Sequence, residues 1–359
     1  MFIKKKIIHS EFLYIFFIFL SLIIFFFSTT KVYGKAFDIS NIEISRPFEI
    51  NFDKNDVLDE GFKKAFSELI LLIVNSKDQK KINQTKLNEI KGMIESFSIK
   101  QEEFINEVYF VNLGVSFNKK KVFNFLEKKN IFPTIPLEKK LLFIPIVIDE
   151  NKKDLLVFGN NNLFKEWNKQ TQSYHLIKYI LPTEDLEDFN LLKKNYDNIE
   201  QYDFKEITSK YNLEDSIIAL IFKNSDELRI LSRISVNDNT VLKNLTFANI
   251  DINNSQNIKD IIEKLKNIYE DHWKNLNQIN TSIKLPLKIK IKNLENKKIL
   301  NFEKVLRNTD LIYDFFIIKF DKDFVYYQIL FNGTPDNFLK NMTKNNFSFN
   351  TQNIIWTLK

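Results

Sequence analysis

Lysines recur near the C-terminus at a spacing that would gather positive charge on one surface. They alternate with leucine and isoleucine along residues 284–292. The four are Lys284, Lys288, Lys290 and Lys292. Successive side chains of a β-strand point to opposite faces, so this pattern predicts a strand with one apolar and one basic face. A basic face could contact anionic lipid head groups or an acidic protein partner. The alternative is a solvated face or edge, where lysines prevent edge-to-edge pairing.

Acidic residues cluster directly after Pro182 and could supply paired carboxylates. The cluster consists of Glu184, Asp185, Glu187 and Asp188. Paired carboxylates perform glycoside hydrolysis, and clustered ones bind calcium. Acidic residues are also favoured at a helix N-terminus by its free amides and dipole. Because no Asp-x-Asp-x-Asp-Gly loop is present, we favour helix capping, and we interpret Asp321 and Asp323 as turn residues.

Other catalytic and metal-binding patterns are missing from the sequence. Neither His175 nor His272 has a second histidine at the spacing of a metal site, and His9 lies in the N-terminal leader. The 6 glycines are too scattered for a phosphate-binding loop, no serine lies in a G-x-S-x-G elbow, and cysteine is absent. We therefore predict a protein that is not an enzyme, with no catalytic residue, cofactor or metal.

The N-terminal leader has the parts of a secretory signal peptide. Basic residues at positions 4–6 precede an apolar run at 12–27, and the small-residue pattern Val32-Tyr33-Gly34 follows. The run is shorter than the ~20 residues of a membrane-spanning helix. We expect Sec export to the periplasm with cleavage between Gly34 and Lys35. An uncleaved helix that anchors the chain in the inner membrane, facing the periplasm, is the alternative.

The net charge of +6 gives little information about binding partners. Part of the excess belongs to the leader, and an exported protein rarely meets nucleic acid. We predict no nucleic-acid binding. We expect other envelope proteins as partners, with peripheral membrane contact as a further option and the oligomeric state left open.

Hydrophobic periodicity predicts an α+β protein in which small mixed sheets pack with helices. After a signal peptide at 1–34, residues 37–150 are expected to form a β-α-α-β-α-β domain. Its later elements are predicted as a helix at 87–97, a strand at 109–117 and a closing strand at 141–148. Residues 151–280 are expected to form an α+β domain with a three-stranded meander and a long closing helix. Residues 281–359 have the β-α-β-β-α-β order of a ferredoxin-like sandwich.

Several of these segments resemble a known bacterial envelope family. They are VYFVNLGVSFNKKKVFNFLEKKNIFPTIPLEKKLLFIPIVID, ITSKYNLEDSIIALIF, LRILSRISV and DIIEKLKNIYEDHWK. Together they resemble the family catalogued as domain of unknown function 2066, which has no assigned activity. The sequence departs from that pattern at Phe117-Asn118 and Leu137-Glu138, where the family has Phe-Asp and Arg-Pro. The module order is also similar to that of periplasmic flagellar and secretion accessory proteins.

Export and the absence of a catalytic pattern together predict a structural or protein-interaction component of the cell envelope. Two alternatives stay open. One is a hydrolase that uses carboxylates brought together by folding, and the other is a module that binds the membrane surface through the four lysines.

Overall fold

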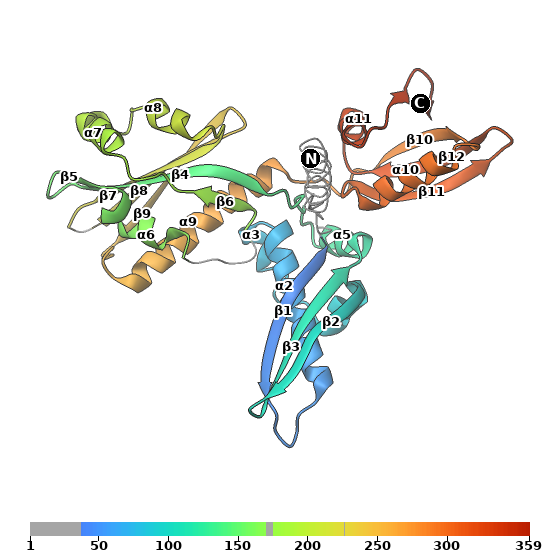
Figure 1. Cartoon of the computed structure of the whole chain (residues 1–359), viewed down its shortest axis with the longest axis horizontal. Helices are drawn as coiled ribbons and strands as arrows, with labels where there is room; N and C mark the ends of the chain where they lie inside the picture. The colour runs from blue at the N-terminus through green and yellow to red at the C-terminus, as the bar shows by residue number, and fades with distance from the viewer. Residues whose placement is uncertain (1–36, 170–174, 226) are drawn as a thin grey trace, which may run out of the picture. The chain divides into compact units, whose positions relative to one another are not determined.

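The computed structural model describes residues 37–169, 175–225 and 227–359 and confirms the α+β prediction (Figure 1). The described residues form three separate sheets packed with helices. The expected signal peptide, with Gly34 and Lys35, lies outside these residues. Within them, no helix combines the length and apolar character needed to cross a membrane.

The first sheet has three antiparallel strands in the order β1-β3-β2. These are β1 (Asp38–Pro47), β2 (Ile94–Ile105) and β3 (Val108–Phe117). The helices of this module are α2 (Lys54–Ile73), α3 (Ser76–Gln79), α4 (Leu87–Met93) and α5 (Lys119–Lys128). The apolar faces of α2 and α5 pack with alternate residues of β1 and β3 in one core, which explains the period-two pattern of β3.

The helix predicted at 87–97 is wrong beyond Met93. Residues 94–105 form β2, which pairs with β3 over its whole length and is exposed along almost all of it. Glutamate, glutamine and lysine alternate with few apolar side chains in this strand, so its local pattern carries a weak strand signal. Pairing with β3 overrides that local preference.

The second sheet has six strands, with the path β5-β4-β7-β8-β9 and β6 paired to β4. They are β4 (Lys139–Asp149), β5 (Asp154–Leu156), β6 (Ile177–Ile180), β7 (Ser216–Lys223), β8 (Glu227–Val236) and β9 (Asn239–Ala248). The prediction that residues 141–148 close the first module is wrong, because β4 pairs in parallel with β6 and β7. An unbroken apolar strand is typical of a parallel pair covered on both faces.

Helices cover both faces of this second sheet (Figure 1). On one face lie α7 (Leu186–Lys194) and α8 (Lys205–Thr208), and on the other α6 (Asn162–Trp167) and α9 (Ser255–Leu276). Short 3₁₀ helices flank them at η1 (Phe158–Asn160), η2 (Tyr196–Asn198) and η3 (Ser209–Tyr211). Leu142 and Ile144 enter one core while Leu141 and Phe143 enter the other. The central strands are therefore buried on both sides.

The third sheet has the predicted β-α-β-β-α-β order with one additional short strand, β13 (Phe349–Asn350), before the last. Its elements are β10 (Leu285–Lys292), α10 (Asn296–Asn308), β11 (Ile312–Phe320), β12 (Phe324–Phe331), α11 (Pro335–Lys344), β13 (Phe349–Asn350) and β14 (Ile355–Leu358). The strand order is β11-β12-β10-β14-β13. One detail departs from a simple split βαβ, because the short strand β13 reverses the chain and β14 runs parallel to β10.

A single core lies on one face of the third sheet. Alternate residues of β10 and β12 pack there with α10 and α11, including Ile289, Tyr327, Phe302 and Phe338. Both helices therefore belong to the same side of the sheet. The residues between them along β10 and β12 point to the opposite face, which these helices leave uncovered.

Candidate functional site: the open face of the C-terminal sheet

The uncovered face of the third sheet carries lysines on β10 beside aromatic and polar residues on β12. In the antiparallel register, Lys288 lies opposite Gln328, Lys290 opposite Tyr326, and Lys292 opposite Phe324. Residues directly opposite one another share a face. The predicted basic face therefore exists at these three lysines, and we call it the basic face.

Strand β11 extends the basic face to the edge of the sheet. Phe316 lies opposite Gln328, and Lys319 lies opposite Tyr326. Phe316 is 48% exposed, whereas Phe320 lies opposite Val325 and so belongs to the other face of the sheet. Aromatic side chains of β11 and β12 therefore accompany the lysines of β10.

Two lysine side chains lie over aromatic rings of the basic face. The Lys290 ammonium is 4.6 Å from the centroid of the Phe324 ring, and the Lys319 ammonium is 5.1 Å from that of Tyr326. Such contacts are weakly attractive, and they hold flexible lysine stems against the sheet. The positive charges are thereby held at the surface of the sheet.

The three lysines of β10 have no carboxylate partner in the part of the chain that the structure describes. Lys319 is different, because it pairs with Asp321 at 3.3 Å. Backbone amides of Phe324 and Asp323 donate to the Asp321 carboxylate, and these hydrogen bonds lower its pKa to about 2. Asp321 is thus a turn residue, as predicted, and the uncompensated charge of this face lies on Lys288, Lys290 and Lys292.

The fourth lysine of the predicted group is placed elsewhere. Lys284 precedes β10, its ammonium lies 3.2 Å from the Glu127 carboxylate, and it sits 4.6 Å from the Tyr313 ring centroid. Its charge is therefore compensated by a contact with α5. The expectation that Lys284 shares the free basic surface is wrong, because Glu127 lies far away in the sequence.

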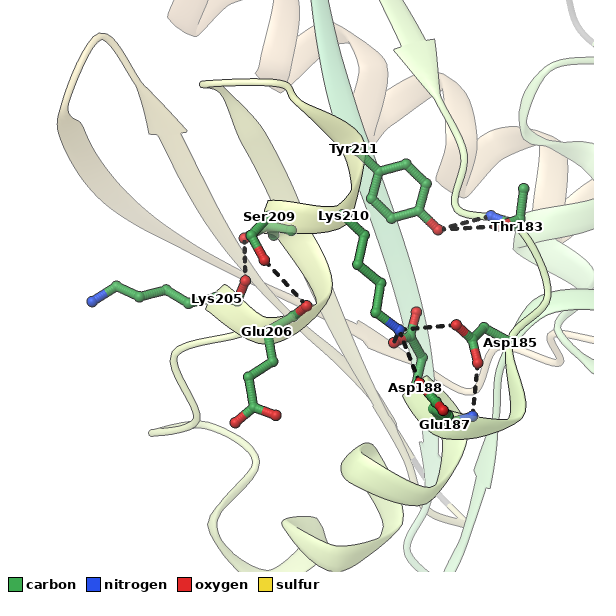
Figure 2. Close-up of polar contacts among 10 residues, drawn as sticks. Thr183, Asp185, Glu187, Asp188, Lys205, Glu206, Ser209, Lys210 and Tyr211 are labelled. Atoms are coloured by element: carbon green, nitrogen blue, oxygen red, sulfur yellow. Dashed lines mark hydrogen bonds and ion pairs between the residues drawn. The ribbon is translucent and has the colours of Figure 1, made fainter.

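Two carboxylates of the acidic cluster after Pro182, those of Asp185 and Asp188, bind the Lys210 ammonium (Figure 2). We call this group of contacts the Lys210 clasp. Asp185 caps α7 by accepting from the backbone N–H of Glu187 at 2.8 Å, which confirms the capping interpretation. The Lys210 ammonium donates to Asp185 at 2.9 Å and to Asp188 at 2.7 Å. The hydrogen bond from Lys210 lowers the pKa of Asp185. A carboxylate that holds its proton less tightly is a poorer general acid.

Neighbouring contacts extend this clasp and connect α7 to the segment that follows α8. The Tyr211 hydroxyl accepts from the Thr183 amide at 3.0 Å, and the Ser209 hydroxyl donates to the carbonyl of Glu206 at 3.4 Å (Figure 2). Glu184 accepts from the Gly159 amide at 3.0 Å. These contacts hold loops and helix ends together over one face of the middle sheet.

The two described histidines lie in the middle module, where helix α9 packs. His175 Nδ1 is 3.6 Å from Glu270, whose carboxylate accepts from the amides of Leu176 and Ile177. Burial and the nearby charges of Lys266 and Lys274 lower the pKa of His175 to about 4, so it is neutral at pH 7. Within the described residues, no group of three potential metal ligands comes together.

Two surface hollows of the described residues are lined without carboxylates, and a third, of ≈ 10 Å³, has Asp188 as its one carboxylate. One, of ≈ 550 Å³, lies beside α2 and is lined by apolar, amide and hydroxyl side chains with Lys63. Another, of ≈ 410 Å³, lies beside α10 and is lined by similar groups with Lys304. Neither lining contains a carboxylate. The carboxylate-dependent hydrolase of the sequence analysis therefore has no site in either hollow.

No family model matches the chain, and no curated protein matches it. The resemblance to the domain of unknown function 2066 stays a hypothesis based on the sequence segments quoted above.

Proposed function

We propose that this protein is an exported, non-enzymatic interaction component of the cell envelope that binds an acidic protein partner through its basic face. The observation that carries the proposal is the set of three lysines on β10 without a carboxylate partner in the described chain, positioned beside Phe324 and Tyr326. A free row of cations attracts an anionic surface. Export is supported by the composition of residues 1–34.

An acidic protein suits this face better than a lipid surface does. The lysine charges lie on a β-sheet between aromatic rings, and Lys290 is held at Phe324. Protein interfaces are rich in aromatic side chains, whose rigid rings lose little conformational entropy on binding. Loose lysines that reach toward head groups are more typical of membrane contact. We therefore keep membrane binding as an alternative outcome of the test.

The test is chemical crosslinking in the native envelope followed by mass spectrometry. The wild-type chain is compared with a basic-face variant that carries Lys288→Glu, Lys290→Glu and Lys292→Glu. We expect the variant to lose its crosslinked proteins, because three like charges now oppose an acidic surface. A matched control changes Lys297, Lys304 and Lys340, on the helices of the same module, to glutamate.

Two results would contradict this function. The first is an unchanged set of crosslinked proteins in the basic-face variant. The second is loss of crosslinks in both variants, which would make the effect a general consequence of net charge. Flotation of the purified wild type with anionic vesicles, but not with neutral ones, would replace the protein partner by the membrane surface.

A further inference from the structure

A second exposed surface lies at one end of the first module. Figure 1 shows the β2–β3 hairpin and the connection from β1 to α2 at this same end. Large apolar side chains are exposed here, among them Ile50, which is fully exposed, and Phe104 at 57%. We call this surface the tip and define its apolar part by Phe48, Ile50, Phe104, Ile105 and Val108.

The tip is an ordered aromatic cluster and not a loose loop. The Phe48 ring contacts the Phe104 ring at 4.8 Å and the Phe52 ring at 4.9 Å between centroids. The Phe52 ring contacts that of Tyr109 at 5.0 Å. The Phe48 amide also donates to the Glu107 carbonyl at 2.7 Å, which connects β1 to the hairpin. Apolar side chains held in fixed positions at a surface are typical of a protein contact.

The tip also carries an excess of negative charge. Its cations are already neutralised, because Arg46 pairs with Glu60 and Lys54 pairs with Glu102. Exposed carboxylates without an ion pair in the described chain include those of Glu49, Glu103 and Glu107. The tip thus combines an apolar centre with acidic surroundings.

The basic face has the complementary combination. It carries three uncompensated lysines beside the exposed ring of Phe316, while the tip carries three uncompensated glutamates around exposed phenylalanines. From this match we propose that the tip of one chain docks on the basic face of a second copy. The inference rests on the proposed function, because it names a partner for the same basic face.

The charges also determine the geometry of this contact. Two tips would oppose glutamate to glutamate, and two basic faces would oppose lysine to lysine, so both symmetric contacts are disfavoured. The contact is therefore between unlike surfaces, head to tail. Each bound copy still offers a free tip or a free basic face, so the association continues into a ring or an open chain.

Sedimentation velocity of the purified full-length chain tests the inference with two variants. The basic-face variant is the one defined above, and the tip variant carries Glu49→Lys, Glu103→Lys and Glu107→Lys. The wild type is expected to form larger species as concentration rises and smaller ones as salt is added. Each variant alone is expected to self-associate at least about tenfold more weakly, because like charges meet at every contact.

A mixture of the two variants distinguishes this contact from all symmetric ones. The basic-face variant keeps a native tip, and the tip variant keeps a native basic face. The mixture should therefore form large species in which the two variants alternate, because the native tip meets a native basic face and the lysine-bearing tip meets the glutamate-bearing face. A chain with both sets of substitutions should again form large species, since its charges are exchanged and still complementary. Circular dichroism melting verifies that each variant is folded.

Three results would overturn the inference. They are a wild type that stays monomeric at every soluble concentration, a mixture that stays monomeric while the wild type associates, and a tip variant that associates as the wild type does. If crosslinking to envelope proteins still depends on the basic face in any of these cases, the proposed function stands and only the second copy is excluded as partner. If neither self-association nor crosslinking to envelope proteins depends on the basic face, the proposed function is excluded as well.

Discussion

The middle and C-terminal sheets use β-strands of similar length in opposite ways. Along β4 and β7 nearly every side chain is buried, because helices cover both faces. Along β10 burial alternates, and the lysines lie on the face without helices. The middle sheet is therefore enclosed on both sides, whereas the C-terminal sheet leaves one face without helices. The sequences of the strands show this difference. Strand β4 contains the apolar run LLFIPIVID, whereas β10 alternates apolar residues with lysine in LPLKIKIK.

The largest expected loss of unfolding free energy comes from creating a cavity in the core of the middle sheet. Phe143 is fully buried, and its ring stacks on Trp167 with 3.8 Å between centroids. Phe143→Ala should lower the free energy of unfolding by about 3–5 kcal/mol, since a large cavity remains. Phe316→Ala, on the exposed edge of the C-terminal sheet, should change it by less than about 1 kcal/mol. Urea denaturation measures both, and equal losses would remove the distinction between the sheets.

Substitution of Lys210 tests whether the Lys210 clasp stabilises the layer of α7 and α8 on the middle sheet. Lys210→Met leaves the buried Asp188 carboxylate without its cation, so the urea midpoint should fall, though by less than for Phe143→Ala. The double variant with Asp188→Asn should recover part of the loss. Hydrogen exchange should become faster in β4 and stay unchanged in β10. A midpoint equal to that of the wild type would mean that the clasp does not stabilise this layer.

The layer on the opposite face of the middle sheet, which contains α9, should respond to acid through His175. Its pKa in the folded chain is about 4, below the ordinary 6.5, so between these values the unfolded chain binds more protons. Stability that is present above pH 6.5 is therefore lost as the pH falls toward 4. Allowing for partial solvent screening, the loss is about 1–2 kcal/mol. Burial raises the pKa of Glu270, which acts in the opposite direction above pH 4.5.

His175→Gln isolates this contribution, because Glu270 remains in both proteins. The difference in unfolding free energy between wild type and variant should shift between pH 7 and pH 4.5 in the direction of a weaker wild type. A difference that does not depend on pH would show that His175 is protonated equally in the folded and unfolded chains.

The smallest effect on stability is expected where the largest effect on binding is proposed. Lys288→Glu, Lys290→Glu and Lys292→Glu lie on an uncovered face, so each should change the free energy of unfolding by no more than about 0.5–1 kcal/mol. Thermal and urea denaturation check this expectation. A large loss of unfolding free energy would mean that the basic face stabilises the fold. Binding would then be tested with single lysine substitutions in place of the triple variant.

The sequence predicted the basic face of the C-terminal sheet but not the aromatic residues that lie beside its lysines. The alternation of lysine with leucine and isoleucine in β10 is a local signal, and it correctly placed Lys288, Lys290 and Lys292 together. The neighbours Phe324, Tyr326 and Phe316 depend on the pairing register of three strands, which local pattern does not determine. The sequence analysis therefore missed the aromatic part of the face.

Long-range contacts explain the other differences. Lys284 continues the lysine spacing, yet it binds Glu127, which is 157 residues away. The apolar run of β4 identifies a buried strand, but it carries no signal for the sheet that the strand joins. Strand β2 is exposed and has mostly polar side chains, so its sequence lacks the apolar alternation that predicts a strand. Only its pairing with β3 identifies it as one.

Site-specific photocrosslinking tests most directly whether the open face is the binding surface. A photoreactive phenylalanine analogue replaces Tyr326 on the basic face, and in a matched control it replaces Lys297 on α10 of the same module. We predict crosslinked proteins in the envelope for Tyr326 and not for Lys297, and their loss when Lys288, Lys290 and Lys292 become glutamate. Equal crosslinking at both positions, or crosslinks at Tyr326 that survive the charge reversal, would contradict the account.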